Sequence, residues 1–158
     1  MSVEMFVSLK VPDNVAITAF NALKRLGYKL KKLERSDYYK FDVNGNVEDF
    51  KGKISNTDIL VNANKHKFSF SIKNNNINNK KQNKNNKIIN ILVQDLDNGN
   101  GLLKTLKERL GFDNIKKLEK GILWSMYFDK KVNGKKTAID ITKNLLMNEN
   151  YQKYKVLG

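Results

Sequence analysis

Apolar and polar side chains alternate along residues 3–11, and this period of two predicts a strand with one buried face. Pro12 ends the predicted strand. Asp13 or Asn14 can cap a following helix by accepting hydrogen bonds from backbone N–H groups. Apolar side chains then recur at helical spacing until Gly27, because a glycine adopts the left-handed conformation of a C-terminal cap without strain. The chain therefore opens with a strand and a helix.

The periodicity of the remaining residues predicts further strands and helices in both halves of the chain. The first half continues with a strand at 30–43, a turn at 44–46, a helix at 47–54 and a strand at 67–72. The second half has strands at 88–93, 115–128 and 151–156 and helices at 101–110 and 136–147. Each half reads β-α-β-α-β, or β-α-β-β-α-β if its long strand breaks, near Ser36 and Asp37 or near Gly121.

An internal repeat organises these elements. Residues 25–35, Arg-Leu-Gly-Tyr-Lys-Leu-Lys-Lys-Leu-Glu-Arg, recur at 109–120 as Arg-Leu-Gly-Phe-Asp-Asn-Ile-Lys-Lys-Leu-Glu-Lys, with one residue inserted after the aromatic. The offset is 84 residues before the insertion and 85 after it. We infer two copies of one unit, 1–73 and 88–158, which are each too small for a large core and would pack together. The predicted fold is α+β, a tandem duplication that forms one pseudo-twofold body.

A segment with almost no apolar residues joins the two units. Residues 74–87 contain eight Asn, four Lys, one Gln and a single apolar residue, Ile77. Such a composition cannot bury enough apolar surface to offset the conformational entropy lost on ordering. We therefore expect an Asn/Lys-rich flexible linker.

Composition excludes several chemistries. The 158 residues include 30 Lys and Arg, 16 Asp and Glu and no Cys, for a net charge of +14. Without cysteine there can be no disulfide, thiolate zinc site, iron–sulfur cluster or cysteine nucleophile. The net charge suggests a polyanionic partner, but it divides almost evenly, as +5, +4 and +5, among unit one, linker and unit two. An even distribution favours a solvated surface over a phosphate-binding track.

Nothing in the sequence suggests a membrane segment. The start of the chain lacks a basic stretch followed by an apolar one, and no apolar run approaches the roughly 18 residues of a membrane span. We expect a soluble cytoplasmic protein that does not contact a membrane.

Candidate catalytic residues are few. His66, between Lys65 and Lys67, is the only imidazole, and one His without Cys neighbours makes neither a metal site nor a catalytic triad. Glu48 and Asp49 begin a predicted helix, where the helix dipole alone favours acidic side chains. We therefore expect no catalytic, cofactor-binding or metal-binding residues, and the partner-binding residues cannot be named.

Two weaker patterns point to ligands. Asp95 and Asp97 precede the Asn-Gly-Asn-Gly turn 98–101, which could bind an anion at a helix start but lacks the Gly-Lys-Ser/Thr ending of a phosphate loop, so a simple loop is favoured. The stretch 65–72 is rich in Lys and Phe, as in the base-stacking strand of RNA-recognition modules, but lacks their glycines. Its apolar side chains, at period two, are more simply the inner face of a strand. They are Phe68, Phe70 and Ile72.

The chain resembles the PurS family in two short patterns. They are Ala-Leu-x-x-Leu-Gly-Tyr at 22–28 and Leu-Leu-x-Asn at 145–148, before the last strand. Its members are small subunits of phosphoribosylformylglycinamidine synthase in purine biosynthesis. The resemblance covers both halves, each near the length of one family member. It implies an α+β unit that works as a pair, supplies no chemistry itself and holds a PurL-like, ATP-dependent synthetase subunit together with a PurQ-like glutaminase subunit. Two copies in one chain would correspond to a fused PurS dimer.

We therefore expect a non-catalytic assembly subunit of this synthase, without cofactors, either a monomeric pseudo-dimer or a homodimer. A diverged paralogue with other partners is a variant of this hypothesis. The alternative is a basic α+β module that binds RNA or another polyanion through the linker lysines and exposed aromatics. A third hypothesis is a sensor that binds a small anion between the two units.

Overall fold

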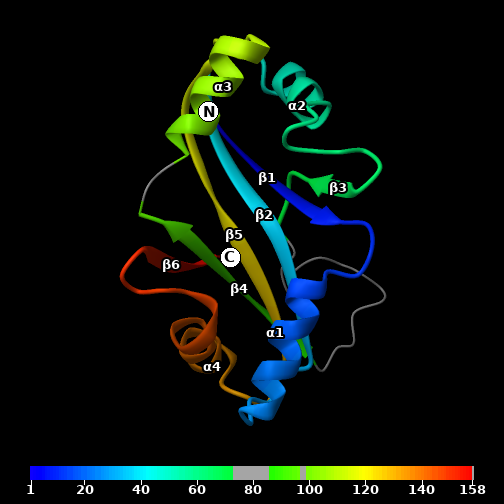
Figure 1. Cartoon of the computed structure of the whole chain (residues 1–158), viewed down its shortest axis with the longest axis vertical. Helices are drawn as coiled ribbons and strands as arrows, with labels where there is room; N and C mark the ends of the chain where they lie inside the picture. The colour runs from blue at the N-terminus through cyan, green and yellow to red at the C-terminus, as the bar shows by residue number, and fades with distance from the viewer. Residues whose placement is uncertain (73–85, 97–98, 158) are drawn as a thin grey trace.

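The computed structural model of the chain describes residues 1–72, 86–96 and 99–157, and within them an α+β fold with one six-stranded antiparallel sheet and four α-helices (Figure 1). In chain order the elements are β1 (Ser2–Leu9), α1 (Asn14–Arg25), β2 (Lys32–Val43), α2 (Val47–Ser55), β3 (His66–Ser69), β4 (Asn86–Asp95), α3 (Asn100–Leu110), β5 (Ile115–Asp129), α4 (Gly134–Ile141), a π-helical segment η1 (Thr142–Leu146) and β6 (Gln152–Leu157). The strands are arranged in the order β3-β1-β2-β5-β4-β6. The β2–β5 pair thus lies at the centre of the sheet.

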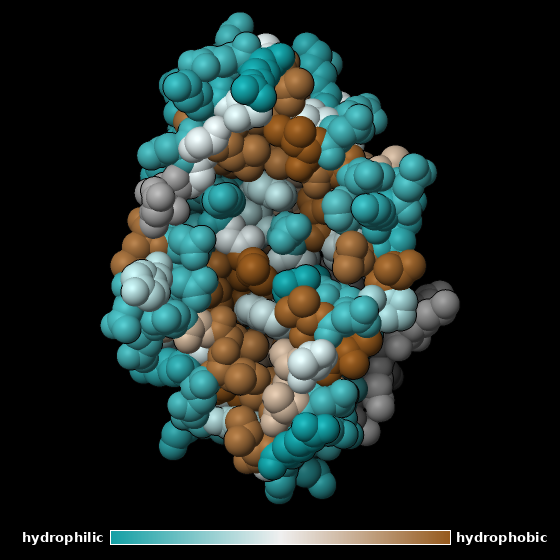
Figure 2. All heavy atoms as spheres, viewed as in Figure 1, coloured by the Kyte–Doolittle hydropathy of each residue, from teal (hydrophilic) through white to brown (hydrophobic). Residues whose placement is uncertain are grey.

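The helices pack on one face of the sheet, in two pairs. α2 and α3 lie near one end of the long central strands, and α1 and α4 lie near the other (Figure 1). Each pair covers its own core cluster: β1 and the C-terminal part of β2 lie beneath α2 and α3, whereas β4 and the C-terminal part of β5 lie beneath α1 and α4. Apolar side chains gather beside the helices at each end, and hydrophilic ones cover the outer helix surfaces (Figure 2).

Local sequence explains the helix ends. The Asp13 carboxylate accepts hydrogen bonds from the backbone N–H groups of Val15 and Ala16, which confirms the predicted cap of α1. The same carboxylate pairs with the Arg35 guanidinium through two hydrogen bonds of 2.9 and 3.2 Å. Gly27 follows α1 with φ of +90°, a conformation that other residues adopt only with strain.

The predicted elements are present, with some corrections at their boundaries. Both central strands run without a break, so each half has the order β-α-β-α-β. The predicted helix 136–147 is α-helical only to Ile141, since the buried Thr142 hydroxyl donates to the carbonyl of Ala138 and Met147 N–H donates to the carbonyl of Thr142. This π-type bond changes the last turn into η1.

The predicted linker falls largely on residues 73–85, which lie outside the described residues. Asn86 and Lys87, its last two residues, belong to β4 and are opposite Asp129 and Phe128 of β5. Their polar side chains do not prevent pairing with β5, because strands pair through hydrogen bonds between backbone groups. β4 therefore begins two residues before the predicted strand 88–93.

The inner-face prediction for Phe68 is wrong. Phe68 lies on β3 and remains 46% exposed, and Phe70, at an edge contact with it, is half-buried. β3 has four residues and is an edge strand, so Phe68 has a neighbouring strand on one side only.

Candidate functional site

The candidate residues His66 and Asp95, which the sequence singled out, take part in hydrogen bonds that stabilise the fold. Nδ1 of His66 accepts a hydrogen bond from the backbone N–H of Asn62 at 3.0 Å, which occupies one ring nitrogen. Across residues 1–72, 86–96 and 99–157, no carboxylate is hydrogen-bonded to this imidazole. Asp95 accepts a hydrogen bond from Gln152 Nε2 at 3.0 Å and so ties β4 to β6. Asp97 and Asn98, the start of the predicted anion loop, lie outside the described residues.

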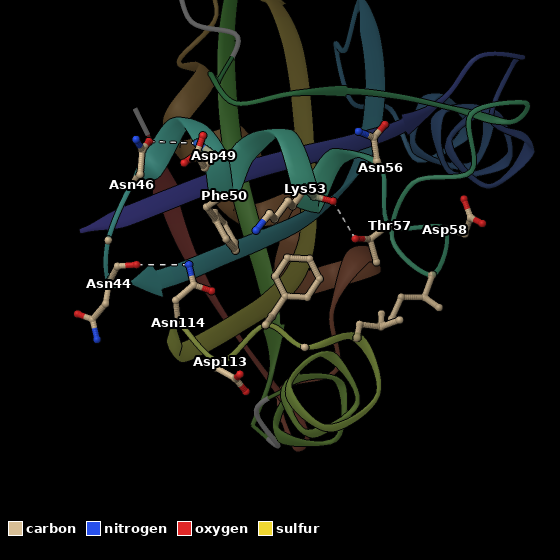
Figure 3. Close-up of a pocket in the computed structure, with 15 residues that line it drawn as sticks. Asn44, Asn46, Asp49, Phe50, Lys53, Asn56, Thr57, Asp58, Asp113 and Asn114 are labelled. Atoms are coloured by element: carbon tan, nitrogen blue, oxygen red, sulfur yellow. Dashed lines mark hydrogen bonds between the residues drawn. The ribbon is translucent and has the colours of Figure 1, made fainter.

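A large pocket of about 830 Å³ opens between α2 and the turn from α3 to β5 (Figure 3). We call it the α2 pocket. Two segments far apart in the sequence form it, residues 44–59 and 110–114. The sequence pattern gave no sign of this juxtaposition, because it depends on the pairing of β2 with β5.

Hydrogen bonds hold the two walls of the α2 pocket together. The Asn44 N–H donates to the Asn114 carbonyl at 2.9 Å, and the Asn114 side-chain amide donates back to the Asn44 carbonyl at 3.3 Å. The Asn46 side chain caps α2 by accepting hydrogen bonds from the N–H groups of Glu48 and Asp49. These hydrogen bonds fix the position of both walls relative to each other.

The floor of the α2 pocket is aromatic. Phe50 of α2 and Phe112 of the turn are 2% and 7% exposed, and their rings meet edge to face with centroids 6.0 Å apart. Two aliphatic side chains beside them stay open to solvent: Ile59 is 53% exposed and Leu110 is 46% exposed. The pocket thus offers apolar contact area to an incoming side chain.

The rim of the α2 pocket is acidic. Asp49, Asp58 and Asp113 line it, together with a single cation, Lys53 (Figure 3). In the part of the chain that the structure describes, none of the three carboxylates takes part in an ion pair. An excess of negative charge is notable on a chain whose net charge is +14.

A second pocket, of about 610 Å³, lies at the other end of the molecule between α4 and the turn from α1 to β2. We call it the α4 pocket. The Tyr28 hydroxyl donates to Asp140 Oδ2 at 2.8 Å and accepts from the Asn144 amide at 2.9 Å. The cations that line it are Lys29, Lys136 and Lys143, and its single carboxylate is that of Asp140. Its charge is therefore opposite to that of the α2 pocket.

A smaller pocket, of about 210 Å³, has walls from β1, β2, β3 and β5. Its polar wall includes Ser8, Ser36, Ser69, Ser71 and Ser125. Ser125 donates a hydrogen bond of 2.7 Å to the buried Asn90 side chain, so this hydroxyl already has a structural partner.

A charged cluster lies near the start of α1. Neighbouring strands partly desolvate the Asp37 carboxyl and raise its pKa, and the nearby Asp13 charge adds to this effect, while the positive charges of Arg35 and His66 act in the opposite direction. Two positions further along β2, burial raises the pKa of Tyr39 to about 12. Both groups therefore favour their protonated forms more than in free solution.

A scan against models of protein families finds no match to this chain, and a search of curated proteins finds no relative. Within the described residues, no group of three or more His, Cys, Asp or Glu side chains is placed to hold a metal ion. None of the described helices combines the length and apolar character needed to cross a lipid bilayer.

Proposed function

We propose that this chain is a tandem PurS-like protein, an assembly subunit of phosphoribosylformylglycinamidine synthase that bridges the ATP-dependent synthetase subunit and the glutaminase subunit. The observation that carries this proposal is the agreement between the sequence repeat and the pairing of the central strands. The strand order β3-β1-β2-β5-β4-β6 places the two halves in mirror order on either side of the β2–β5 pair.

The register of β2 and β5 agrees with the repeat found in the sequence. An offset of 85 residues relates Arg35 to Lys120 and Tyr39 to Trp124. Arg35 is opposite Trp124 in the sheet, and Tyr39 is opposite Lys120. A twofold operation would exchange these two pairs with each other, which supports a duplicated, pseudo-twofold pair of units in one polypeptide.

Such an intramolecular pair fits the family that the sequence resembles, whose units work as pairs. Each pocket at the ends of the molecule combines a helix of one half with a turn of the other: α2 with the turn after α3, and α4 with the turn after α1. The pair therefore presents two separate concave surfaces, which suits a subunit that must contact two different large partners.

The proposal is tested by affinity capture of the full chain from native lysate at about 300 mM salt, a concentration that weakens binding to polyanions by orders of magnitude. Mass spectrometry of the captured proteins should identify both the synthetase and the glutaminase subunits. Recovery of neither subunit would overturn the proposal. If RNA is captured at low salt and lost as salt rises, the polyanion-binding alternative takes its place.

A further inference from the structure

We propose that the α2 pocket is a docking site for a basic segment of a partner protein, which inserts an apolar side chain between Ile59 and Leu110 and places its cations on the acidic rim. The inference deepens the proposed function, on which it rests, by stating the chemistry that one docking surface recognises.

The shape and apolar floor of the pocket favour an inserted side chain. Phe50 and Phe112, already almost fully buried, close the bottom of the pocket, so an entering side chain meets a closed apolar floor. Ile59 and Leu110 are about half exposed, and their apolar surface would be buried when the side chain inserts. Burial of apolar surface at the centre with a polar rim is the usual anatomy of a protein interface.

The position of the acidic residues is not explained by helix stability. Asp49 lies in the first turn of α2, where the helix dipole favours a carboxylate. Asp58 and Asp113 instead lie two residues beyond the C-terminal caps of α2 and α3, Asn56 and Gly111, close to the negative ends of both dipoles. Negative charge near a helix C-terminus is unfavourable. Helix stability therefore does not account for these two carboxylates.

The fold does not impose an acidic rim, as the α4 pocket shows. It is formed by the corresponding helix and turn of the other half, yet lysines line it. Lys136, in the first turn of α4, opposes the helix dipole there, whereas Asp49 in the first turn of α2 agrees with it. The charge of each pocket is therefore a property of its side chains.

The negative charge of the rim favours a cationic occupant of the α2 pocket. The carboxylates of Asp58 and Asp113 would repel phosphate groups, so a nucleic acid is disfavoured at this position, while the rest of a strongly positive chain repels cationic segments. The α4 pocket of a second copy has the complementary charge, but two concave surfaces cannot fill each other. A protruding basic segment with an apolar side chain satisfies both the charge and the shape.

The test is an NMR titration of the full, isotopically labelled chain at about 50 mM salt with three blocked synthetic peptides: Lys-Leu-Lys-Lys, Lys-Ala-Lys-Lys and Glu-Leu-Glu-Glu. We expect the first peptide to shift the backbone amides of residues 53–59 and 110–114 saturably. The second should bind more weakly because it lacks the apolar anchor. The third should leave those amides unchanged.

Charge variants complete the test. The double variant Asp58→Asn with Asp113→Asn should weaken the Lys-Leu-Lys-Lys complex about 2-fold to 30-fold, the range that corresponds to two exposed charge pairs of about 0.2 to 1 kcal/mol each. Neither side chain caps a helix, so the variant retains the fold. The matched control Asp140→Asn, in the α4 pocket, should leave the affinity unchanged.

Three results would overturn the inference: no saturable shift at the α2 pocket, equal affinity in the double variant, or the same amides shifting on dilution without peptide, which would mean that a second copy occupies the pocket. The titration contains neither synthetase nor glutaminase. Its failure therefore rejects the docking site alone, whereas the affinity capture decides the proposed function separately.

Discussion

The α2 end and the α4 end of the molecule have the same construction, a helix from one half against a turn from the other, but different interactions hold them together. At the α2 end, the turn residue Phe112 packs its ring against Phe50 in a buried aromatic contact. At the α4 end, the corresponding turn residue is Tyr28, and its hydroxyl connects to Asp140 and Asn144 near the surface.

The difference shows how one scaffold supports two surface chemistries. An aromatic contact below the surface leaves the rim of the α2 pocket free to carry carboxylates that form no ion pair within the described residues. The α4 end uses its rim residues for structure, since Asp140 takes part in the hydrogen bonds that join helix to turn. Substitutions at the two ends should therefore have different effects on stability.

The largest effect is expected from Phe50→Ala at the α2 end. The substitution removes a ring that contacts both Phe41 and Phe112 and leaves a cavity, so the free energy of unfolding should fall by about 3 to 5 kcal/mol. Chemical denaturation measures it. The control Lys136→Ala, at the exposed rim of the other end, should change stability by less than about 0.5 kcal/mol. A loss below about 1 kcal/mol for Phe50→Ala would contradict the aromatic support of this end.

Gly121→Ala compares corresponding positions of the two central strands. An added Cβ at Gly121 would approach the Val93 carbonyl oxygen to 2.7 Å and the Leu92 side chain to 2.9 Å, so we expect a loss of about 1 to 3 kcal/mol. The repeat places Ser36 at the equivalent position of β2, where Ser36→Ala serves as the matched control and should be nearly neutral. Equal losses in both variants would show that close approach at Gly121 is not the cause.

Asp13→Ala tests the charged cap beside the α4 end. It removes the cap of α1 and leaves the Arg35 guanidinium, which is 26% exposed, without its bidentate partner. The expected destabilisation is about 1 to 2 kcal/mol, measured by thermal unfolding. Asp13→Asn retains a capping oxygen and should recover part of the loss. If the Asn variant is as unstable as the Ala variant, the cap is not what stabilises this site.

Tyr28→Phe makes the turn of the α4 end like that of the α2 end. It removes the hydrogen bonds to Asp140 and Asn144, and because these groups are close to solvent the loss should be about 1 kcal/mol or less. A loss comparable to that of Phe50→Ala would mean that the polar network supports its end as strongly as the aromatic contact does.

The smallest effect concerns the charge of Asp37, whose counterpart in the repeat is the apolar Ile122. Because folding raises the pKa of Asp37 above its ordinary 3.8, the contribution of this group to stability falls as pH rises from 3.8 through the raised value. Asp37→Asn should therefore become more stable than the parent protein across that range and match it at lower pH. The opposite trend in parallel pH series of thermal unfolding would show that Arg35 and His66 outweigh desolvation.

Sequence patterns predicted the elements well, because a strand or helix with one buried face repeats its apolar residues at a fixed period. The caps also follow from local chemistry, as Asp13 and Gly27 illustrate. Phe68 is exposed although its pattern is that of an inner face, since periodicity does not reveal that a strand lies at the sheet edge.

The pockets could not be predicted in the same way. The floor of the α2 pocket joins Phe50 to Phe112, residues far apart in the chain that meet only because β2 and β5 pair. Of the rim residues, only Asp49 stood out in the sequence, beside Glu48, and a helix dipole explains acidic residues at that position without any ligand. Asp113 becomes part of the rim only because the fold brings the turn after α3 next to α2.

The assembly role is tested most directly by native mass spectrometry of the purified full chain mixed with the synthetase and glutaminase subunits in about 300 mM ammonium acetate. If the chain is the proposed tandem PurS-like subunit, the spectrum should show a complex of all three proteins, with one copy of this chain for each synthetase and glutaminase. A synthetase–glutaminase complex that excludes this chain, or a chain that remains alone, would contradict the assembly role.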